Sequence, residues 1–162
     1  MFKTTSIASA VLLSALVSTG ASAIRLSETF EVSVTIPSAA FYVIPAETDW
    51  LHRDQRLPWN PVTQDLSPLR KPFDVKNDSG AITARLSFEP FLSNGKDTDS
   101  IPLVVTFNHK RLGLTAEEVI SALDGKAGQR VNLEIVPVKP VDGFKPGDYH
   151  GSVHMVFEAL AP

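Results

Sequence analysis

The residues with the greatest potential for catalysis or metal binding are two histidines near the C-terminus. His150 and His154 are four residues apart in a segment whose pattern predicts a strand, so both imidazoles lie on one face. A catalytic zinc site needs at least a third protein ligand, which leaves exposed strand histidines as the expected role. The chain has no Gly-x-Ser-x-Gly, no glycine-rich phosphate loop and no cysteine. The sequence therefore predicts a protein that is not an enzyme and that holds no metal or cofactor.

Two further segments have residue types that bind ligands in other proteins. Asp97-x-Asp99 begins like a calcium-binding loop, but its sixth and twelfth positions are Pro102 and Asn108, where Gly and Glu are needed. Trp50 and Trp59 border a segment rich in proline and charge. They could contact a receptor or a carbohydrate, and packing inside the domain is the alternative.

The elements that would position these residues follow an N-terminal export signal. Lys3 precedes the apolar stretch 7–17, and Ala21-Ser22-Ala23 gives the small-x-small pattern of a cleavage site between Ala23 and Ile24. Removal of residues 1–23 from the 162-residue chain leaves 139 residues, a length that suits one domain. Lys3 is the only charged residue removed, so the formal net charge changes from −3 to −4. This balance argues against a nucleic-acid partner.

Residues 24–36 alternate between apolar and polar side chains. Only Glu28 interrupts the apolar set, and Pro37 ends the pattern. This period of two predicts a strand with one apolar face. The apolar residues are Ile24, Leu26, Phe30, Val32, Val34 and Ile36.

The rest of the chain predicts further strands and one helix. Strands are expected at 41–44, 73–76, 81–89, 101–108, 131–136 and 149–158, with an irregular crossing over 46–71. A helix is expected over 114–123, with Thr115 as N-cap, Glu118 completing a capping box and Gly125 ending it. The pattern favours an all-β, immunoglobulin-like sandwich with one short helix.

The two amphipathic strands at the ends of the chain have two interpretations. They could be the first and last strands of a closed sandwich. Alternatively, the segment exposed by cleavage leaves its own domain and completes the sheet of a neighbour, as in donor-strand complementation. The sandwich would then be incomplete by itself, and head-to-tail addition of this kind gives a filament because it does not close.

The sequence resembles the alpha-fimbrial major pilins, the colonisation-factor-antigen type of fimbrial subunit from the alternate chaperone–usher pathway. The resemblance covers nearly all of the chain after residue 23. The absence of cysteine agrees with this family, whereas residues 49–61 and Glu28 depart from it. The matching segments are the strand 30–36 with Pro37, Leu57-Pro58, the segment 73–78 ending in Lys76-Asn77-Asp78, the strand 82–86, the strand 101–107 followed by Leu112 and the expected helix at 115–118, and the closing segment 146–153 with Tyr149 and Gly151.

The resemblance implies a fimbrial subunit that supports adhesion and reaches the cell surface through the periplasm. Its implied partners are other copies of itself, a periplasmic chaperone, an outer-membrane usher and a tip adhesin. The implied organisation is a signal peptide at 1–23, a donor-strand arm at 24–37 and a β-sandwich domain at 38–162. A self-contained exported sandwich that binds a ligand or carbohydrate through the Trp50–Trp59 loop is the competing hypothesis. An exported hydrolase is a third, without a catalytic constellation to support it.

Overall fold

The computed structural model describes residues 40–51, 53–96 and 98–161. Contacts divide the chain into Met1–Val34 and Thr35–Pro162, and every described residue belongs to the second part. The predicted signal peptide at 1–23 and the predicted arm at 24–37 lie outside the described residues.

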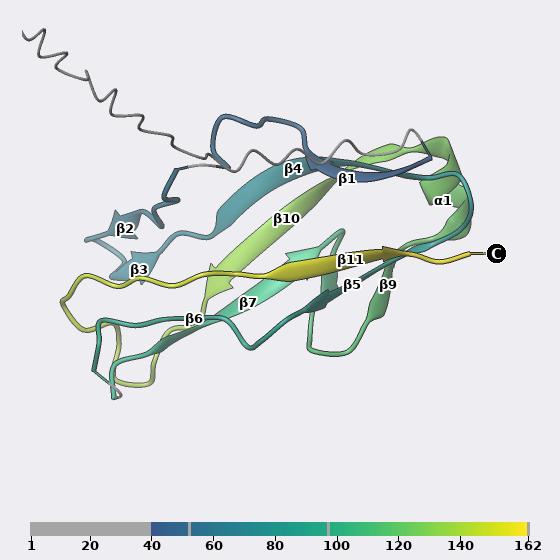
Figure 1. Cartoon of the computed structure of the whole chain (residues 1–162). Coiled ribbons are helices and arrows are strands. Elements are labelled where there is room, and N and C mark those ends of the chain that lie inside the picture. The colour runs from purple at the N-terminus through teal and green to yellow at the C-terminus, as the bar shows by residue number, and fades with distance from the viewer. Residues whose placement is uncertain (1–39, 52, 97, 162) are drawn as a thin grey trace, which may run out of the picture. The chain divides into compact units, whose positions relative to one another are not determined.

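Two antiparallel sheets form the described domain (Figure 1). The larger sheet has the order β1-β4-β10-β7-β6, with β8 pairing with β7, and the smaller has the order β11-β5-β9. A two-stranded ribbon, β2-β3, stands apart from both. The bounds are β1 Phe41–Pro45, β2 Trp59–Asn60, β3 Asp65–Leu66, β4 Leu69–Asn77, β5 Ile82–Leu86, β6 Phe91–Leu92, β7 Ile101–Phe107, β8 Lys110–Arg111, β9 Glu117–Ile120, β10 Gln129–Pro137 and β11 Met155–Ala159, with one helix, α1, at Ala122–Ala127.

The core lies between the two sheets and confirms the predicted sandwich. Alternate residues of β7 and β10 are buried, because successive side chains of a strand point to opposite faces. Phe107 is fully buried. The centre of its ring lies 5.6 Å from that of Phe73 in the same sheet and 4.8 Å from that of Phe157 in the other sheet. The buried apolar cluster is Phe73, Val75, Ile82, Ala84, Leu86, Leu103, Val105, Phe107, Leu112, Val119, Ile120, Val131, Leu133 and Ile135.

Strand β4 is longer than the predicted strand 73–76, because Pro72 is accommodated within it. Its carbonyl accepts from the amide of Ala46 at 2.9 Å, just after β1 ends. The residue opposite Pro72 is thus Ala46, one position beyond the end of β1. The missing N–H of Pro72 therefore removes no hydrogen bond from the regular β1–β4 ladder. The strand consequently extends back to Leu69 and pairs with β10 over its first seven residues, Leu69 to Val75.

The predicted helix at 114–123 is wrong in position. Residues 117–120 form β9, which pairs with β5, and Val119 and Ile120 are buried in the core. The helix starts later, at N-cap Ser121, whose Oγ accepts from the amide of Asp124 at 3.2 Å. Gly125 lies inside the helix rather than after it, and the C-cap is Gly128. β-branched residues facing the core favoured the strand over the weaker capping signal at Thr115.

The predicted C-terminal strand at 149–158 is only partly correct. Regular pairing is confined to β11, and His150 forms an isolated bridge with Ser93. At Gly151 the chain passes so close to the carbonyl oxygen of Phe91 that a Cβ would overlap it. Residues 149–154 therefore lie against the segment around β6 without forming a regular ladder.

Candidate functional site

The outer edge of β11 presents backbone groups that no described strand pairs. At the two ends of the β5–β11 pairing, the amide of Ser87 donates to the carbonyl of His154 and the amide of Leu160 to that of Ala81. Hydrogen-bonded and non-hydrogen-bonded pairs alternate along an antiparallel ladder. The backbone groups of the odd-numbered residues, Met155, Phe157 and Ala159, are therefore directed away from β5.

Strand β1 is the corresponding edge of the larger sheet. The amide of Ala46 donates to Pro72 and the amide of Asp78 donates to the carbonyl of Ala40, so the even-numbered residues of β1 bond to β4. Val43 therefore directs its backbone groups outward, and Pro45 presents only a carbonyl there because it has no N–H.

The edges β1 and β11 lie on the same side of the sandwich. Strand β9 lies beside the end of β7, because the Asn108 side-chain amide donates to the Val119 carbonyl at 2.7 Å. Strand β11 is on the other side of β5, and that is the side on which the larger sheet ends in β1. In the part of the chain that the structure describes, the two sheets are thus left unjoined on this side.

Apolar side chains from both edges face the gap between the sheets. They are partly buried and pack against the core rather than being fully covered by it. They are Phe41 and Val43 on β1, Met155 and Phe157 on β11, and Val153 just before β11. We call the outer backbone of β11 together with these five side chains the open side.

The two tryptophans singled out in the sequence have different roles. Trp50 packs edge-on against Phe73 with the ring centres 6.1 Å apart, and the Lys71 ammonium lies 5.0 Å from the centre of its ring. Its indole nitrogen is buried without a hydrogen-bond partner among the described residues. Trp59 is 47% exposed and contacts Phe144 edge-on at 5.9 Å. Internal packing thus explains Trp50, whereas Trp59 is at the surface.

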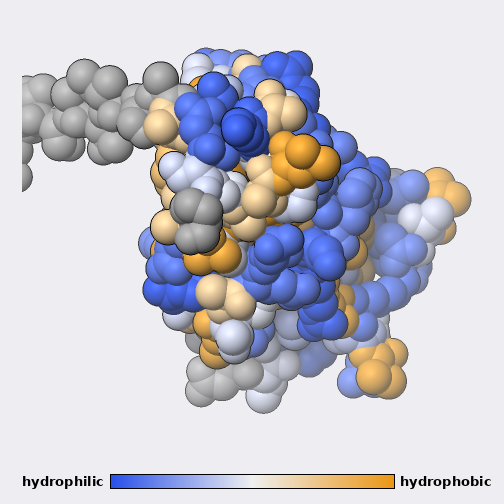
Figure 2. Space-filling model, turned by 90° about the vertical axis from the view of Figure 1, so that its right-hand side faces the viewer, coloured by the Kyte–Doolittle hydropathy of each residue, from blue (hydrophilic) through white to orange (hydrophobic). Residues whose placement is uncertain are grey.

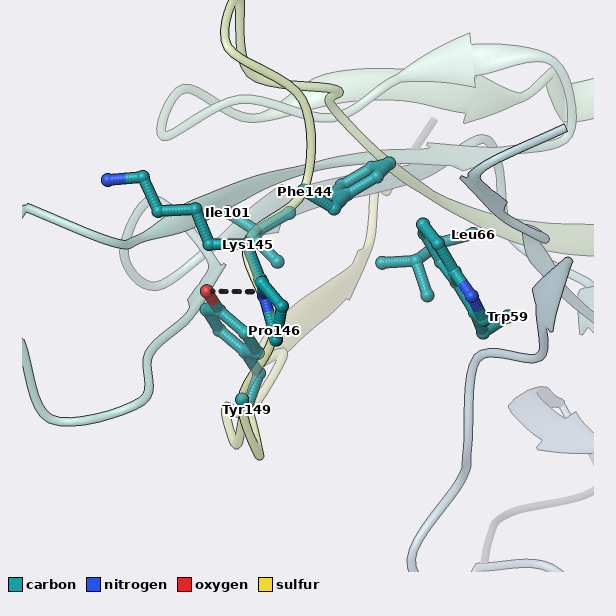
Figure 3. A pocket seen from close by; sticks show the side chains of 8 residues that line it. Trp59, Leu66, Ile101, Phe144, Lys145, Pro146 and Tyr149 are labelled. Atoms are coloured by element: carbon teal, nitrogen blue, oxygen red, sulfur yellow. Dashed lines mark hydrogen bonds between the residues drawn. The ribbon is translucent and has the colours of Figure 1, made fainter. Parts of the chain in front are cut away.

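Trp59 lines an apolar pocket of about 320 Å³ (Figure 3). The pocket lies between the β2-β3 ribbon, the start of β7 and the loop that precedes β11. The Tyr149 hydroxyl donates to the Lys145 carbonyl at 3.2 Å and so holds this loop closed on itself. We call this cavity the end pocket. It is lined by Trp59, Leu66, Ile101, Phe144, Lys145, Pro146, Gly147 and Tyr149.

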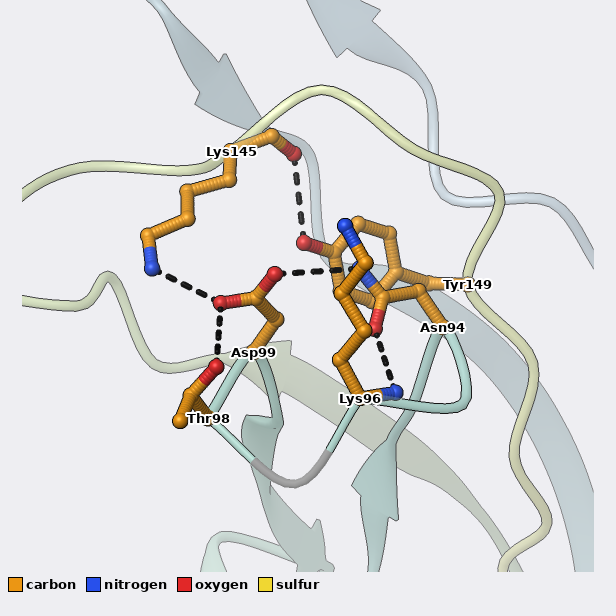
Figure 4. Close-up of polar contacts among 6 residues, drawn as sticks. All are labelled: Asn94, Lys96, Thr98, Asp99, Lys145 and Tyr149. Atoms are coloured by element: carbon orange, nitrogen blue, oxygen red, sulfur yellow. Dashed lines mark hydrogen bonds and ion pairs between the residues drawn. The ribbon is translucent and has the colours of Figure 1, made fainter.

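An ion pair between Lys145 and Asp99 ties the same loop to the segment between β6 and β7 (Figure 4). The Asp99 carboxylate accepts from Lys145 at 2.7 Å, from Thr98 at 3.1 Å and from Asn94 at 3.4 Å, and its side chain is only 9% exposed. These hydrogen bonds, that from Lys145 foremost, hold the pKa of Asp99 below its ordinary value, and Asp99 in turn raises the pKa of Lys145. Asp99 is therefore engaged in an ion pair within the domain.

The histidines are not brought together with other ligands. His150 bridges to Ser93 through its backbone, and the His154 ring lies 5.1 Å from that of Phe88. Within the described ranges no group of three His, Cys, Asp or Glu side chains is placed to hold a metal ion. Nor does any helix there have the length and hydrophobicity to cross a membrane.

The sequence analysis raised an incomplete sandwich as one interpretation, but it did not predict which residues form the open side, and it did not predict the end pocket. The open side depends on which residues of β11 bond to β5, and the pocket joins segments more than 80 residues apart, from Trp59 to Tyr149. The predicted donor residues between Ile24 and Ile36 lie outside the described residues.

Comparison with solved structures places this fold among the pilins. Eight chains match, among them the CooA pilin subunit from enterotoxigenic Escherichia coli. It is 20% identical, with a TM-score of 0.62 over 74% of this chain and 86% of that one. At this identity the likeness establishes the fold, an immunoglobulin-like β-sandwich of the pilin type.

Comparison with protein families identifies the chain itself. Residues 26–158 match the family described as the CS1 type fimbrial major subunit, and the chain belongs to that family. No curated protein matches. The resemblance drawn from the sequence is confirmed: the chain is a structural subunit of a cell-surface fimbrium assembled from copies of itself, and its family is not one of enzymes.

Proposed function

We propose that this subunit polymerises by donor-strand complementation, with residues 24–36 of one copy filling the open side of the next. The observation that supports the proposal is that β11 ends the smaller sheet on the side where the larger sheet ends in β1, and that no described strand pairs with the outer backbone groups of β11. An added strand restores the missing backbone pairing of Met155, Phe157 and Ala159.

The side chains of the two partners are complementary. By their alternation, the six apolar residues between Ile24 and Ile36 would share one face of an extended arm and meet the partly buried apolar residues of the open side. Burial of six large side chains contributes roughly 9–18 kcal/mol before ordering costs, at about 1.5–3 kcal/mol each. The backbone ladder adds a modest net term and sets the direction of the arm.

The proposal includes the route to the surface. Cleavage between Ala23 and Ile24 frees the arm. An open, apolar edge is prone to aggregation, so the subunit needs a periplasmic chaperone to cover it until an outer-membrane usher hands it to the growing fibre. The finished fibre carries a tip adhesin and supports adhesion to a host or another surface.

Deletion of residues 24–36 tests the mechanism. The truncated chain should form no fibres by electron microscopy, and it should bind an added peptide of residues 24–36. A peptide in which Phe30, Val32 and Val34 are replaced by Asp is the matched control and should not bind. A stable, monomeric truncated chain that is indifferent to both peptides would show that the arm has no place in a neighbour.

A further inference from the structure

We propose that the end pocket is the docking site for the neighbouring subunit in the fibre, and that Leu123 on helix α1 of that neighbour enters it. This inference deepens the proposed function and rests on it. The pocket and Leu123 both belong to the described residues, and they lie at opposite ends of the folded domain.

One end of the domain carries α1 and the start of β1. The amide of Asp78 donates to the Ala40 carbonyl at 2.8 Å, the side chain of Asn77 donates to Leu160, and Gly125 of α1 packs against the carbonyl of Gly80. The first described residue, Ala40, therefore lies at this end, and the chain enters the domain here. We call it the α1 end.

The segments that line the end pocket, namely β2, β3, the start of β7 and the loop before β11, lie at the other end (Figure 1). Strand β4 runs from Leu69, close to the β2-β3 ribbon, to Asn77 at the α1 end. A strand of this length separates the two ends by about 27 Å. Leu123 and the pocket of the same molecule are therefore too far apart to meet.

The direction of the arm brings the two surfaces of neighbouring subunits together. Every strand pair in the described sheets is antiparallel, and β11 runs from the pocket end towards the α1 end. An arm antiparallel to β11 then ends, at Ile36, beside the pocket end of the acceptor. Only residues 37–39 separate Ile36 from Ala40 of the donor, and this connection spans at most about 14 Å. The α1 end of the donor is thus held next to the pocket of the acceptor.

The two surfaces also suit each other chemically. Leu123 is 82% exposed and lies on the opposite face of α1 from the buried Gly125. Figure 2 shows this end of the molecule as mainly hydrophilic, with hydrophobic residues in separate spots. A single projecting leucine in polar surroundings fits a small apolar pocket rimmed by Lys145 better than it fits a flat hydrophobic interface.

Disulfide cross-linking tests the contact directly, because the chain has no cysteine of its own. Leu123→Cys is combined with Pro146→Cys, which places a thiol in the pocket lining without removing an aromatic wall. Oxidised fibres should then give a covalent ladder after boiling in denaturant. The matched control combines Pro146→Cys with Leu114→Cys, because Leu114 is 52% exposed but lies in the loop before β9. Fibres of this control should give only monomers after the same oxidation and boiling.

The outcomes separate this inference from the proposed function. Fibres that form normally but give no ladder with Leu123→Cys, or as strong a ladder with Leu114→Cys, overturn the docking contact and leave strand donation intact. Absence of fibres from the cysteine-free parent overturns strand donation itself.

Association strength provides a second measurement. Leu123→Asp and Trp59→Ala should each weaken the association of subunits about ten- to hundredfold, whereas Leu114→Asp should not. Fibres of unchanged stability from both variants would contradict the inference. Loss of glycan binding by Trp59→Ala without any effect on the fibre would contradict it too, because the pocket would then serve a small ligand.

Discussion

Replacement of Phe157 by Ala is the sharpest perturbation of the open side. Phe157 lies in the middle of β11, where its backbone is directed outward and its ring packs against the fully buried Phe107 at 4.8 Å. It therefore contributes both to the core of the subunit and to the surface that would receive the arm. Glu158 is the matched control, since its side chain is exposed and points to the other face of the same strand.

The expected magnitude follows from the burial of the ring. A fully buried Phe→Ala substitution costs about 3–5 kcal/mol, and the partial burial of Phe157 places it near the lower limit, at about 3 kcal/mol. About 1 kcal/mol of this is the contact between the two rings. For a domain of this size, such a loss lowers the melting temperature by roughly 12 °C.

The assay is denaturant unfolding of the chain lacking residues 24–36 and saturated with the arm peptide. Fluorescence of Trp50 reports unfolding, because its indole packs against Phe73 of the core. Phe157→Ala should lower the free energy of unfolding by about 3 kcal/mol. Glu158→Ala should change it by less than about 0.5 kcal/mol. If the two variants unfold alike, the ring at Phe157 does not link the open side to the core.

Three further changes test other parts of the structure. Because Lys145 lowers the pKa of Asp99, its carboxylate stabilises the fold fully above the ordinary value of 3.8 and loses this effect as pH falls through the lower, folded value. Wild type should therefore lose more stability than Asp99→Asn between pH 4 and 2 in acid titrations, and parallel curves would refute the pairing. Gly151→Ala should cost about 1–3 kcal/mol in thermal melts by forcing the chain away from Phe91, and a neutral effect would contradict the close approach. Asn77→Ala should cost about 1–3 kcal/mol by leaving buried turn groups unpaired, with Asp78→Ala as the neutral comparison.

Sequence periodicity was a good guide to the strands that face the core. The alternation at 101–107 and 131–136 is the direct signature of one buried face, and both strands are present. Local signals were weaker where two patterns overlapped. Thr115-x-x-Glu118 and Ser121-x-x-Asp124 both resemble helix starts, and the choice depended on burial of Val119 and Ile120, which only the tertiary structure decides.

The residues that form the open side and the end pocket could not be predicted for a different reason. Alternation along 149–158 indicates which side chains face the core but not which backbone groups are left without a partner. That depends on the register between β11 and β5 and on the position of β9. The pocket joins Trp59, Ile101 and Phe144, and no periodic pattern relates residues so far apart.

Amide hydrogen exchange along β11 would detect the addition of the arm as the next strand beside β11. The chain lacking residues 24–36 is compared with and without the arm peptide. Binding should slow exchange at Met155, Phe157 and Ala159, whose amides point outward, while Val156 and Glu158 are already paired with β5 and should change much less. Peptide binding that leaves all three outward amides unchanged would mean that the arm does not become the next strand beside β11.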